Sequence, residues 1–331
     1  MHVYLVTTTR LEGYFVTAHD PTLTLDDQIF VTEMEKRGHQ MKMLPWNTAT
    51  DLDSFEDDAV FIIRSPWDYQ MYPTEFRRWL DSMHTKGIRV LNHPSVIHWN
   101  LNKRAYLQEL TSKGISIAPT IFTGSSYLLN DAVFEALKTD EIVVKPEEGA
   151  GAWLTFRIHK NDGWPAFVDK LRALTEDYSR FFHLQIVNES PVITLSNMLI
   201  QPFLPEICEE GEWSLVYFGG NFSHGFLKKP NVKDGDFRVQ EEHGGSLHLD
   251  EVPGWIAEEG RHLLELCFPA TSSASGSTDG HDMPLYIRVD GCIVKNTFLL
   301  MELELFEPEL YFRADPQAAE RLAVALENYP L

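Results

Sequence analysis

The sequence predicts an α/β protein with a parallel sheet at its N-terminus and smaller α+β lobes after it. In the first hundred residues, short apolar runs alternate with segments of helical pattern, which is typical of a parallel sheet. A second, smaller set of strands and helices follows. Later strand-like runs are joined by short turns, which indicates antiparallel pairing. We therefore predict three units, at residues 1–100, 101–195 and 196–331.

The first unit is expected to contain alternating strands and helices. The strands are predicted at Val3–Thr8, Met41–Leu44, Ala59–Arg64 and Arg89–Leu91, and the helices at Leu25–Arg37 and Thr74–Lys86. Ligands of parallel sheets bind beyond the carboxyl ends of the strands. Arg64 and Ser65 stand at such an end, where Arg64 could pair with a substrate carboxylate. A structural salt bridge of Arg64 is an equally good interpretation.

The second unit begins with a predicted helix at Asn102–Lys113. Further strands are predicted at Thr120–Phe122, Ile142–Pro146 and Trp153–Ile158, and further helices at Ala132–Leu137 and Ala166–Leu174. Glu147–Gly151 follows a strand end and holds two glycines, which permit close approach of the backbone to a phosphate. A plain β-turn is the alternative for this segment.

The third unit is predicted to be mainly antiparallel. Trp213–Phe218 and Asn221–Leu227 form a hairpin about Gly219-Gly220. The long charged segment Lys228–Gly245 is of a length that is usually functional or disordered inside a compact domain. Helices are expected at Pro253–Phe268 and Pro316–Glu327, and a surface loop at the Ser/Gly-rich stretch Thr271–Gly280.

A second hairpin in this unit concentrates charge. Two β-rich runs flank Lys295–Thr297, and a turn centred on Asn296 places Arg288 opposite Glu304 and Asp290 opposite Glu302. These four side chains then project from one face of the hairpin. Neighbouring carboxylates repel one another unless a cation lies among them, and oxygen ligands of this kind suit Mg²⁺. A solvated polar strand face is the alternative.

Composition excludes several classes of protein. The 331 residues carry a net charge of −21, which argues against a nucleic-acid partner. No apolar run is long enough for a membrane span, and the N-terminus lacks the pattern of a signal peptide, so we expect a cytoplasmic protein. The three cysteines are far apart and are expected to be reduced thiols.

Several segments together resemble the ATP-grasp superfamily, and within it the D-cycloserine synthetase group. Asn100–Ala105 with Lys103, Ile142–Pro146 with Lys145, and Ile200–Pro205 followed by Glu212 occur in the superfamily's order. The charged hairpin is similar to the superfamily's metal segment, Arg-x-Asp followed by Glu-x-Asn, with Glu304 in place of Asn. The blocks shared with the D-cycloserine synthetase group are Arg64–Tyr69, Asn92–Pro94, Trp99–Lys103, Ser214–Phe218, Phe222–His224 and Glu302–Pro308.

The resemblance implies an ATP-grasp fold. Residues 1–100 would be the pre-ATP-grasp domain, 101–195 the small central lobe, and 196–331 the C-terminal lobe with the metal site. It implies ATP and two Mg²⁺ ions as cofactors. The implied ligands are Lys103 and Lys145 for the phosphates, Gln201 with the backbone near Phe203 and Leu204 for adenine, Glu212 for ribose, and Asp290, Glu302 and Glu304 for the metal. Arg288 would stabilise the transferred phosphoryl group, and Arg238 would fold over the site with its loop.

The resemblance also implies a reaction, namely an ATP-dependent, ADP-forming union of a carboxylate with an amine through an acyl phosphate. The substrates would be small molecules, most simply amino acids, and the protein could be a homodimer. Two alternatives stay open: an intramolecular ligase that closes a ring, and an ATP-binding regulatory protein without turnover. Glu304 adds a negative charge to the metal segment, and the segment Arg10–His19 does not match the D-cycloserine synthetase pattern, so the substrate does not carry over.

Overall fold

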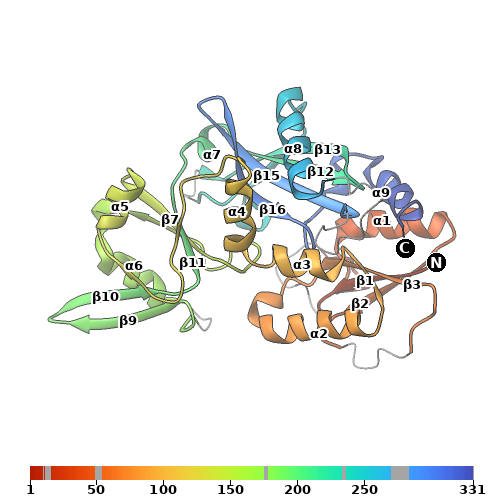
Figure 1. The fold of residues 1–331 in the computed structure, drawn as a ribbon, viewed down its shortest axis with the longest axis horizontal. Helices are drawn as coiled ribbons and strands as arrows, with labels where there is room; N and C mark the ends of the chain where they lie inside the picture. Colours follow the sequence, from red (N-terminus) through yellow and green to blue (C-terminus); the bar gives the residue numbers. More distant parts are fainter. Residues whose placement is uncertain are drawn as a thin grey trace.

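The computed structural model describes residues 1–9, 11, 16–48, 54–174, 178–232, 236–269 and 283–330. The predicted surface loop at Thr271–Gly280 lies outside these residues. Figure 1 shows a molecule in which the central lobe stands apart while the N-terminal and C-terminal parts lie against each other. Within the described ranges, no helix is both long and apolar enough to cross a membrane.

The N-terminal sheet is parallel throughout, as the sequence predicted. Its order is β2-β1-β3-β4. Its strands are β1 (His2–Thr7), β2 (Gln40–Pro45), β3 (Ala59–Ser65) and β4 (Arg89–Leu91), and its helices are α1 (Leu25–Lys36), α2 (Pro73–Thr85) and α3 (Pro94–Asn100). Because alternate residues of a strand face opposite ways, Leu5 packs with the α1 side while Val6 packs with the α2 side. The helices α1 and α2 therefore cover opposite faces (Figure 1).

The α1 face of this sheet is buried against the C-terminal lobe. One hydrophobic cluster joins Val3 and Val60 of the sheet to Phe218 and Phe226 of the C-terminal strands and to Leu322 of helix α9 (Ala318–Glu327). All five side chains are nearly inaccessible to solvent. Burial of this kind contributes roughly 1.5–3 kcal/mol per large side chain, so the two parts share a core and are not loosely tethered.

Two asparagines fix the same contact by hydrogen bonds. Asn92 donates to the carbonyls of Tyr286 and Leu305 and accepts from the backbone of Leu285. Asn100 donates to the carbonyl of Leu303 at 2.7 Å and accepts from Leu305 N–H. Both amides are buried, and each satisfies backbone groups that would otherwise be buried without a partner. The ends of the charged hairpin are thereby held by the N-terminal domain.

The central lobe contains two small antiparallel sheets. The larger has the order β5-β11-β7-β8 and the smaller β6-β10-β9. The strands are β5 (Ile121–Phe122), β6 (Tyr127–Leu129), β7 (Glu141–Pro146), β8 (Phe156–His159), β9 (Phe182–Val187), β10 (Ser190–Leu195) and β11 (Met198–Pro202), and the helices are α4 (Lys103–Ser112), α5 (Ala132–Leu137) and α6 (Gly163–Arg172). Strand β11 is an inner strand of the larger sheet, so this sheet extends beyond the boundary predicted at residue 195.

The C-terminal lobe is built on a sheet of order β14-β13-β12-β15-β16. Its strands are β12 (Glu212–Phe218), β13 (Asn221–Lys229), β14 (Ser246–His248), β15 (Tyr286–Val294) and β16 (Thr297–Glu304), and its helices, besides α9, are α7 (Glu206–Glu209) and α8 (Gly254–Cys267). Helix α8 buries Ile256 and Leu263 against Leu215 and Val289 of the sheet. Single 3₁₀ turns occur at Tyr69–Met71, Lys160–Asp162, Glu241–His243 and Phe312–Ala314.

The register of the charged hairpin confirms the predicted residue pairs, although the turn that produces the register differs from the predicted one. Arg288 lies opposite Glu304 and Asp290 opposite Glu302. The turn, however, consists of Lys295 and Asn296 alone, because Thr297 already pairs with Val294. A β-bulge beside Gly291 shifts the register by one residue and restores the predicted pairing at the charged end. Without the bulge, the two glutamates would face the other side of the sheet.

A buried histidine in this sheet makes the stability depend on pH. His224 on β13 is 6% exposed, and its Nε2 lies 2.9 Å from the carbonyl of Leu310. Burial lowers the pKa of His224 to about 4. As the pH falls below the unfolded value of about 6.5, the unfolded chain takes up a proton that the folded protein refuses, so the free energy of unfolding decreases.

We predict that this one residue removes up to about 3 kcal/mol of stability when the pH falls from 7 to 4, because each pKa unit corresponds to about 1.4 kcal/mol. His224→Gln keeps a donor for Leu310 and should make the pH profile of urea unfolding flatter over that range. The exposed His248, changed to Gln, is the control and should leave the profile unchanged. Equal slopes for wild type and His224→Gln would contradict the prediction.

Candidate functional site

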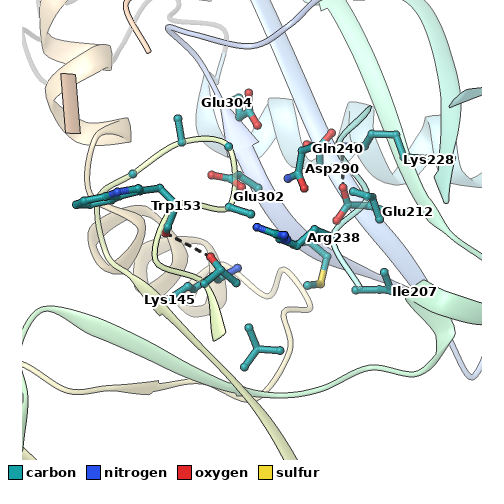
Figure 2. Close-up of a pocket in the computed structure, with 18 of the residues that line it drawn as sticks. Lys145, Trp153, Ile207, Glu212, Lys228, Arg238, Gln240, Asp290, Glu302 and Glu304 are labelled. Carbon is teal, nitrogen blue, oxygen red and sulfur yellow. Dashed lines mark hydrogen bonds and ion pairs between the residues drawn. The ribbon is translucent and has the colours of Figure 1, made fainter. Parts of the chain in front are cut away.

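A cavity between the central lobe and the C-terminal sheet gathers most of the residues that the sequence predicted. Its walls come from β7, the glycine segment after β7, β11, the ends of β12 and β13, and the β15–β16 hairpin (Figure 2). The predicted residues that line it are Lys103, Lys145, Gln201, Phe203, Leu204, Glu212, Arg238, Arg288, Asp290, Glu302 and Glu304. Residues from all three predicted units of the chain therefore meet at one place.

The two lysines predicted to bind phosphate differ in their surroundings. Lys103, at the first turn of α4, forms an ion pair of 2.9 Å with Glu302 and donates to the carbonyl of Gly149. Burial acts to lower the pKa of Lys103, but Glu302 outweighs it and holds that pKa above its usual value. Lys145, on β7, has no acidic partner among the described residues, and burial lowers its pKa. Lys145 is thus a cation without a counter-ion.

Arg288 organises the carboxylates of the hairpin. Its guanidinium donates to both oxygens of Asp290, to the carboxylate of Glu304 and to the backbone carbonyl of Glu309. Burial would raise the pKa of Asp290, but Arg288 and Lys228 lower it to about 2. For Glu304 burial prevails, and its pKa is raised well above the usual range despite Arg288. Asp290 is accordingly a firmly ionised group inside the protein.

Lys228 is a residue of the cavity lining that the sequence analysis did not single out. It is 3% exposed, and its Nζ lies 2.7 Å from Glu212 and 3.3 Å from Asp290. Ser214 donates to the other oxygen of Asp290 at 2.6 Å. The sequence did predict the β12–β13 hairpin, which could have indicated that Lys228 lies near Glu212. The two residues are directly opposite each other, however, only because a bulge beside Val216 shifts the register by one residue. Figure 2 shows Lys228, Glu212 and Asp290 side by side at one end of the cavity.

The segment predicted to bind adenine follows β11. Gln201 is 3% exposed and donates its amide to Thr120, while its position in β11 is fixed opposite Val143. The N–H of Phe203 is used by the carbonyl of Glu141, whereas that of Leu204 has no acceptor among the described residues. Leu204 lines the cavity and is partly buried, and a backbone donor in such a place is suited to a planar, hydrogen-bonding ligand.

Arg238 reaches the cavity from the loop between β13 and β14. Its guanidinium forms a two-pronged ion pair with Asp236, the shortest contact being 2.7 Å. The loop folds back so tightly that a side chain at Gly245 would collide with the carbonyl of Val239. The predicted position of Arg238 over the site agrees with Figure 2, in which it points toward Glu302.

Arg64 and Ser65 do not line this cavity, which corrects their prediction as substrate contacts. Arg64 is 1% exposed and donates to Asp27 at 2.9 Å, and its guanidinium lies over the ring of Tyr286. Ser65 is buried and donates to Thr7. The strand β3 is covered on both faces, so its last residues are part of the core. The structural salt bridge is the interpretation that the structure supports.

Two further lining residues were missed by the sequence analysis. Glu307, just after β16, is 8% exposed, and one of its oxygens accepts a hydrogen bond from Tyr69 at 3.1 Å. Its backbone carbonyl accepts from the indole of Trp67, which also lines the cavity. Burial raises the pKa of Glu307 to about 7, with Lys103 opposing and Glu302 reinforcing the effect. The nearest signal was that Trp67 and Glu307 belong to blocks of the family resemblance.

The carboxylates of the hairpin are not gathered into a preformed metal cluster. Among the described residues, no group of three or more His, Cys, Asp or Glu side chains is placed to hold a metal ion. Glu302 pairs with Lys103, and Glu304 pairs with Arg288. The donors are nevertheless oxygen atoms of the kind that Mg²⁺ prefers, and burial favours a cation beside them.

Comparison with known proteins shows that the chain is similar to one group. Residues 3–92 match the family model for the N-terminal domain of D-cycloserine synthetase DcsG. The cycloserine biosynthesis protein DcsG of Streptomyces lavendulae is 27% identical over 298 residues, which cover 87% of this chain and 88% of the relative.

Solved structures agree on the fold. The crystal structure of D-cycloserine synthetase DcsG superposes with a TM-score of 0.71 at 22% identity, covering 98% of each chain. A RimK-domain ATP-grasp protein from Sphaerobacter thermophilus gives 0.61 at 12% identity over 98% of each chain. D-alanine–D-alanine ligase from Bacillus anthracis gives 0.58 at 14% identity, covering 99% of this chain and 95% of the ligase. The predicted ATP-grasp fold is confirmed by these structures, and in sequence the chain is similar to D-cycloserine synthetase.

Proposed function

We propose that the protein is an ADP-forming ligase that activates a small carboxylate as an acyl phosphate and joins it to an amine. The observation that carries the proposal is Lys145, a largely buried lysine that lines the cavity without an acidic partner among the described residues. An uncompensated buried cation is costly, so it indicates an anionic ligand. The phosphates of ATP supply such an anion, and the carboxylate-bearing hairpin lies on the opposite wall (Figure 2).

The position of the nucleotide is inferred from the walls of the cavity. Gln201 and Leu204 would receive the base, Glu212 the ribose, and Lys103 and Lys145 the phosphates. Two structural neighbours bind ligands of this kind: D-alanine–D-alanine ligase has been solved in complex with ATP, and the ATP-grasp ligase PsnB in complex with Mg and ADP. The ion pair with Lys228 would orient Glu212 toward the ribose hydroxyls.

Magnesium fits the donor set of the hairpin. Asp290, Glu302 and Glu304 would hold it, exchanging part of their contact with Arg288 and Lys103 for the ion. When bound, Mg²⁺ neutralises phosphate charge and orients the γ-phosphoryl group for transfer. The third carboxylate at Glu304 makes this segment more negative than the Glu-x-Asn pattern of the superfamily.

The residues of the chain then serve two steps of chemistry. In the first, a carboxylate oxygen attacks the γ-phosphorus and ADP leaves; in the second, the amine attacks the acyl carbon and phosphate leaves with that oxygen. Phosphoryl transfer depends on positioning and on neutralised charge, which Lys145 and Arg288 would provide. Arg238, carried by its loop, would shield the acyl phosphate from water.

A ring-closing reaction is the second candidate, and the similarity to D-cycloserine synthetase favours it. A screen of amino acids and related acids with Mg-ATP, singly and in pairs, separates the possibilities. ADP release that requires a carboxylate and a separate amine indicates an intermolecular ligase. Release with one bifunctional compound indicates ring closure. If the protein binds the nucleotide but releases no ADP with any compound of the screen, the proposal that it is a ligase of small molecules is wrong.

Glu302→Gln should lower ADP release by roughly 10²-fold or more, because an amide replaces a charge in the phosphoryl-transfer site. The amide oxygen can still accept from Lys103, so the thermal midpoint should change little. Glu309→Gln is the matched control, since Glu309 lines the same cavity but already pairs with Arg313 at 2.6 Å. Near-wild-type turnover in Glu302→Gln would exclude Glu302 as a metal ligand.

Arg238→Ala should lower kcat and increase the share of ATP that is hydrolysed without product, while the affinity for ATP stays close to that of the wild type. The reason is that water reaches an acyl phosphate that is no longer covered. Asp236→Asn removes the ion pair but keeps Arg238 and should retain coupling. Normal rate and normal coupling in Arg238→Ala would place this residue outside the reaction.

The acyl-phosphate route predicts the fate of an isotope. With ¹⁸O in the substrate carboxylate, one labelled oxygen should appear in the released phosphate for each product formed, as measured by mass spectrometry. Adenylation would instead place the label in AMP. Label in AMP, or in neither AMP nor phosphate, contradicts activation by phosphorylation.

A further inference from the structure

Nearly every buried charge that lines the cavity is neutralised by a neighbour. Glu302 pairs with Lys103, and Glu304 with Arg288. Two further pairs are Glu212–Lys228 and Glu309–Arg313. The charged side chains of the lining that lack such a partner therefore indicate where a ligand would carry groups of opposite charge.

Two largely buried charges are left over in the described part of the lining. One is Lys145, which is assigned above to phosphate. The other is Glu307, whose carboxylate forms no ion pair with a described residue and has a single hydrogen bond, on one oxygen, from Tyr69. Glu242 also lines the cavity without an ion-pair partner among the described residues, but the residue as a whole is exposed to solvent, so we do not count it with the two largely buried charges. Within the described part of the chain, a cation and an anion that each lack an ion-pair partner thus line the same cavity.

The carboxylate of Glu307 is held in place from the N-terminal domain. The hydroxyl of Tyr69, which is 2% exposed, donates to one oxygen, and the indole of Trp67 donates to the backbone carbonyl at 2.9 Å. The ring of Tyr69 is itself packed edge-on against Phe306. Glu307 lines the cavity, and its carboxylate accepts this one hydrogen bond from the described residues. A carboxylate that is fixed by buried neighbours and lines a cavity is preorganised for a donor ligand.

The chemistry of that donor follows from the charge. A buried carboxylate is stabilised by a cation that also donates hydrogen bonds, and the ammonium group of a small molecule meets both needs. Burial raises the pKa of Glu307 to about 7, which agrees with an anion that lacks its counter-charge. Trp67 lines the cavity beside it and offers an aromatic ring, which also suits a cation.

We propose that Glu307, positioned by Tyr69 and Trp67, binds the ammonium group of the substrate that is joined in this cavity. The inference rests on the proposed ligase function and deepens it, because it restricts the substrates to compounds that carry an amino group beside the reacting carboxylate or as the incoming amine. It also gives the N-terminal domain a direct part in substrate recognition through residues 67–69.

The test measures the thermal midpoint of the full chain with Mg-ADP and a paired set of small molecules. The set contains L- and D-amino acids together with the carboxylic acids that result when hydrogen replaces each amino group. We expect amino-bearing compounds to raise the midpoint above that with Mg-ADP alone, and their amino-free counterparts to have no such effect. In Glu307→Gln the apparent affinity for the amino-bearing compounds should fall at least about tenfold, as loss of a charge-assisted hydrogen bond implies.

Two variants complete the design. Glu309→Gln removes a charge from the same cavity that Arg313 already neutralises, and should behave as wild type. Tyr69→Phe keeps the ring but removes the hydrogen bond to Glu307. It should lower the apparent affinity for the amino-bearing compounds, while Mg-ADP still raises the thermal midpoint. This outcome separates a positioning role from a general loss of fold.

The proposal is overturned if amino-free acids bind as well as amino acids, if no amino-bearing compound binds while Mg-ADP does, or if Glu307→Gln loses Mg-ADP as well. These failures differ from failure of the proposed function. If the wild-type protein binds neither Mg-ADP nor Mg-ATP, the proposed ligase function itself is contradicted.

Discussion

The site depends on one buried ionic network across the C-terminal sheet. Asp290 lies between Arg288 on its own strand and Lys228 on β13, and Ser214 on the intervening strand β12 donates to it. Removal of one member of such a network leaves an uncompensated buried charge, at a cost of about 3–5 kcal/mol. The same residues that align the strands therefore also fix the charges that face the cavity.

In this network, most of the cations that face the cavity are already paired with carboxylates of the protein. Arg288 is occupied by Asp290, Glu304 and a backbone carbonyl, and Lys103 is occupied by Glu302. A phosphate or a metal ion must compete with these internal partners, so ligand binding should be accompanied by rearrangement of ion pairs. Lys145 needs no such exchange, which makes it the natural first contact for an anionic nucleotide.

The N-terminal domain acts on the site through contacts that are mostly apolar or between neutral groups. Asn92 and Asn100 hold the ends of β15 and β16 by hydrogen bonds to backbone groups, and the hydroxyl of Tyr286 donates to the carbonyls of Ile63 and Leu91 in the N-terminal domain. Tyr69 and Trp67 then extend this contact to Glu307. Because hydrogen bonds of this kind are directional, the domain sets the orientation of the segment that follows β16.

The sequence by itself determined the class of fold and named most of the charged residues that line the cavity. Alternating strand and helix patterns identified the parallel sheet, and the family resemblance named the lysines, Gln201, Glu212 and the charged hairpin, all of which the structure brings to one cavity. These predictions rested on local periodicity and on motifs of a few residues, which a sequence states directly.

The tertiary structure alone decided the register, the pairing of charges and the fate of Arg64. Bulges beside Gly291 and Val216 shift each hairpin by one residue, and a shift by one residue exchanges the two faces of a strand. The pairing of Lys228 with Glu212 follows from such a shift, while Arg64 is removed from the cavity because Asp27, distant in sequence, folds against it. Glu307 and Lys145 stand out only when the other charged side chains that line the described part of the cavity have been paired with their neighbours, and that pairing is a property of three-dimensional packing that no local pattern contains.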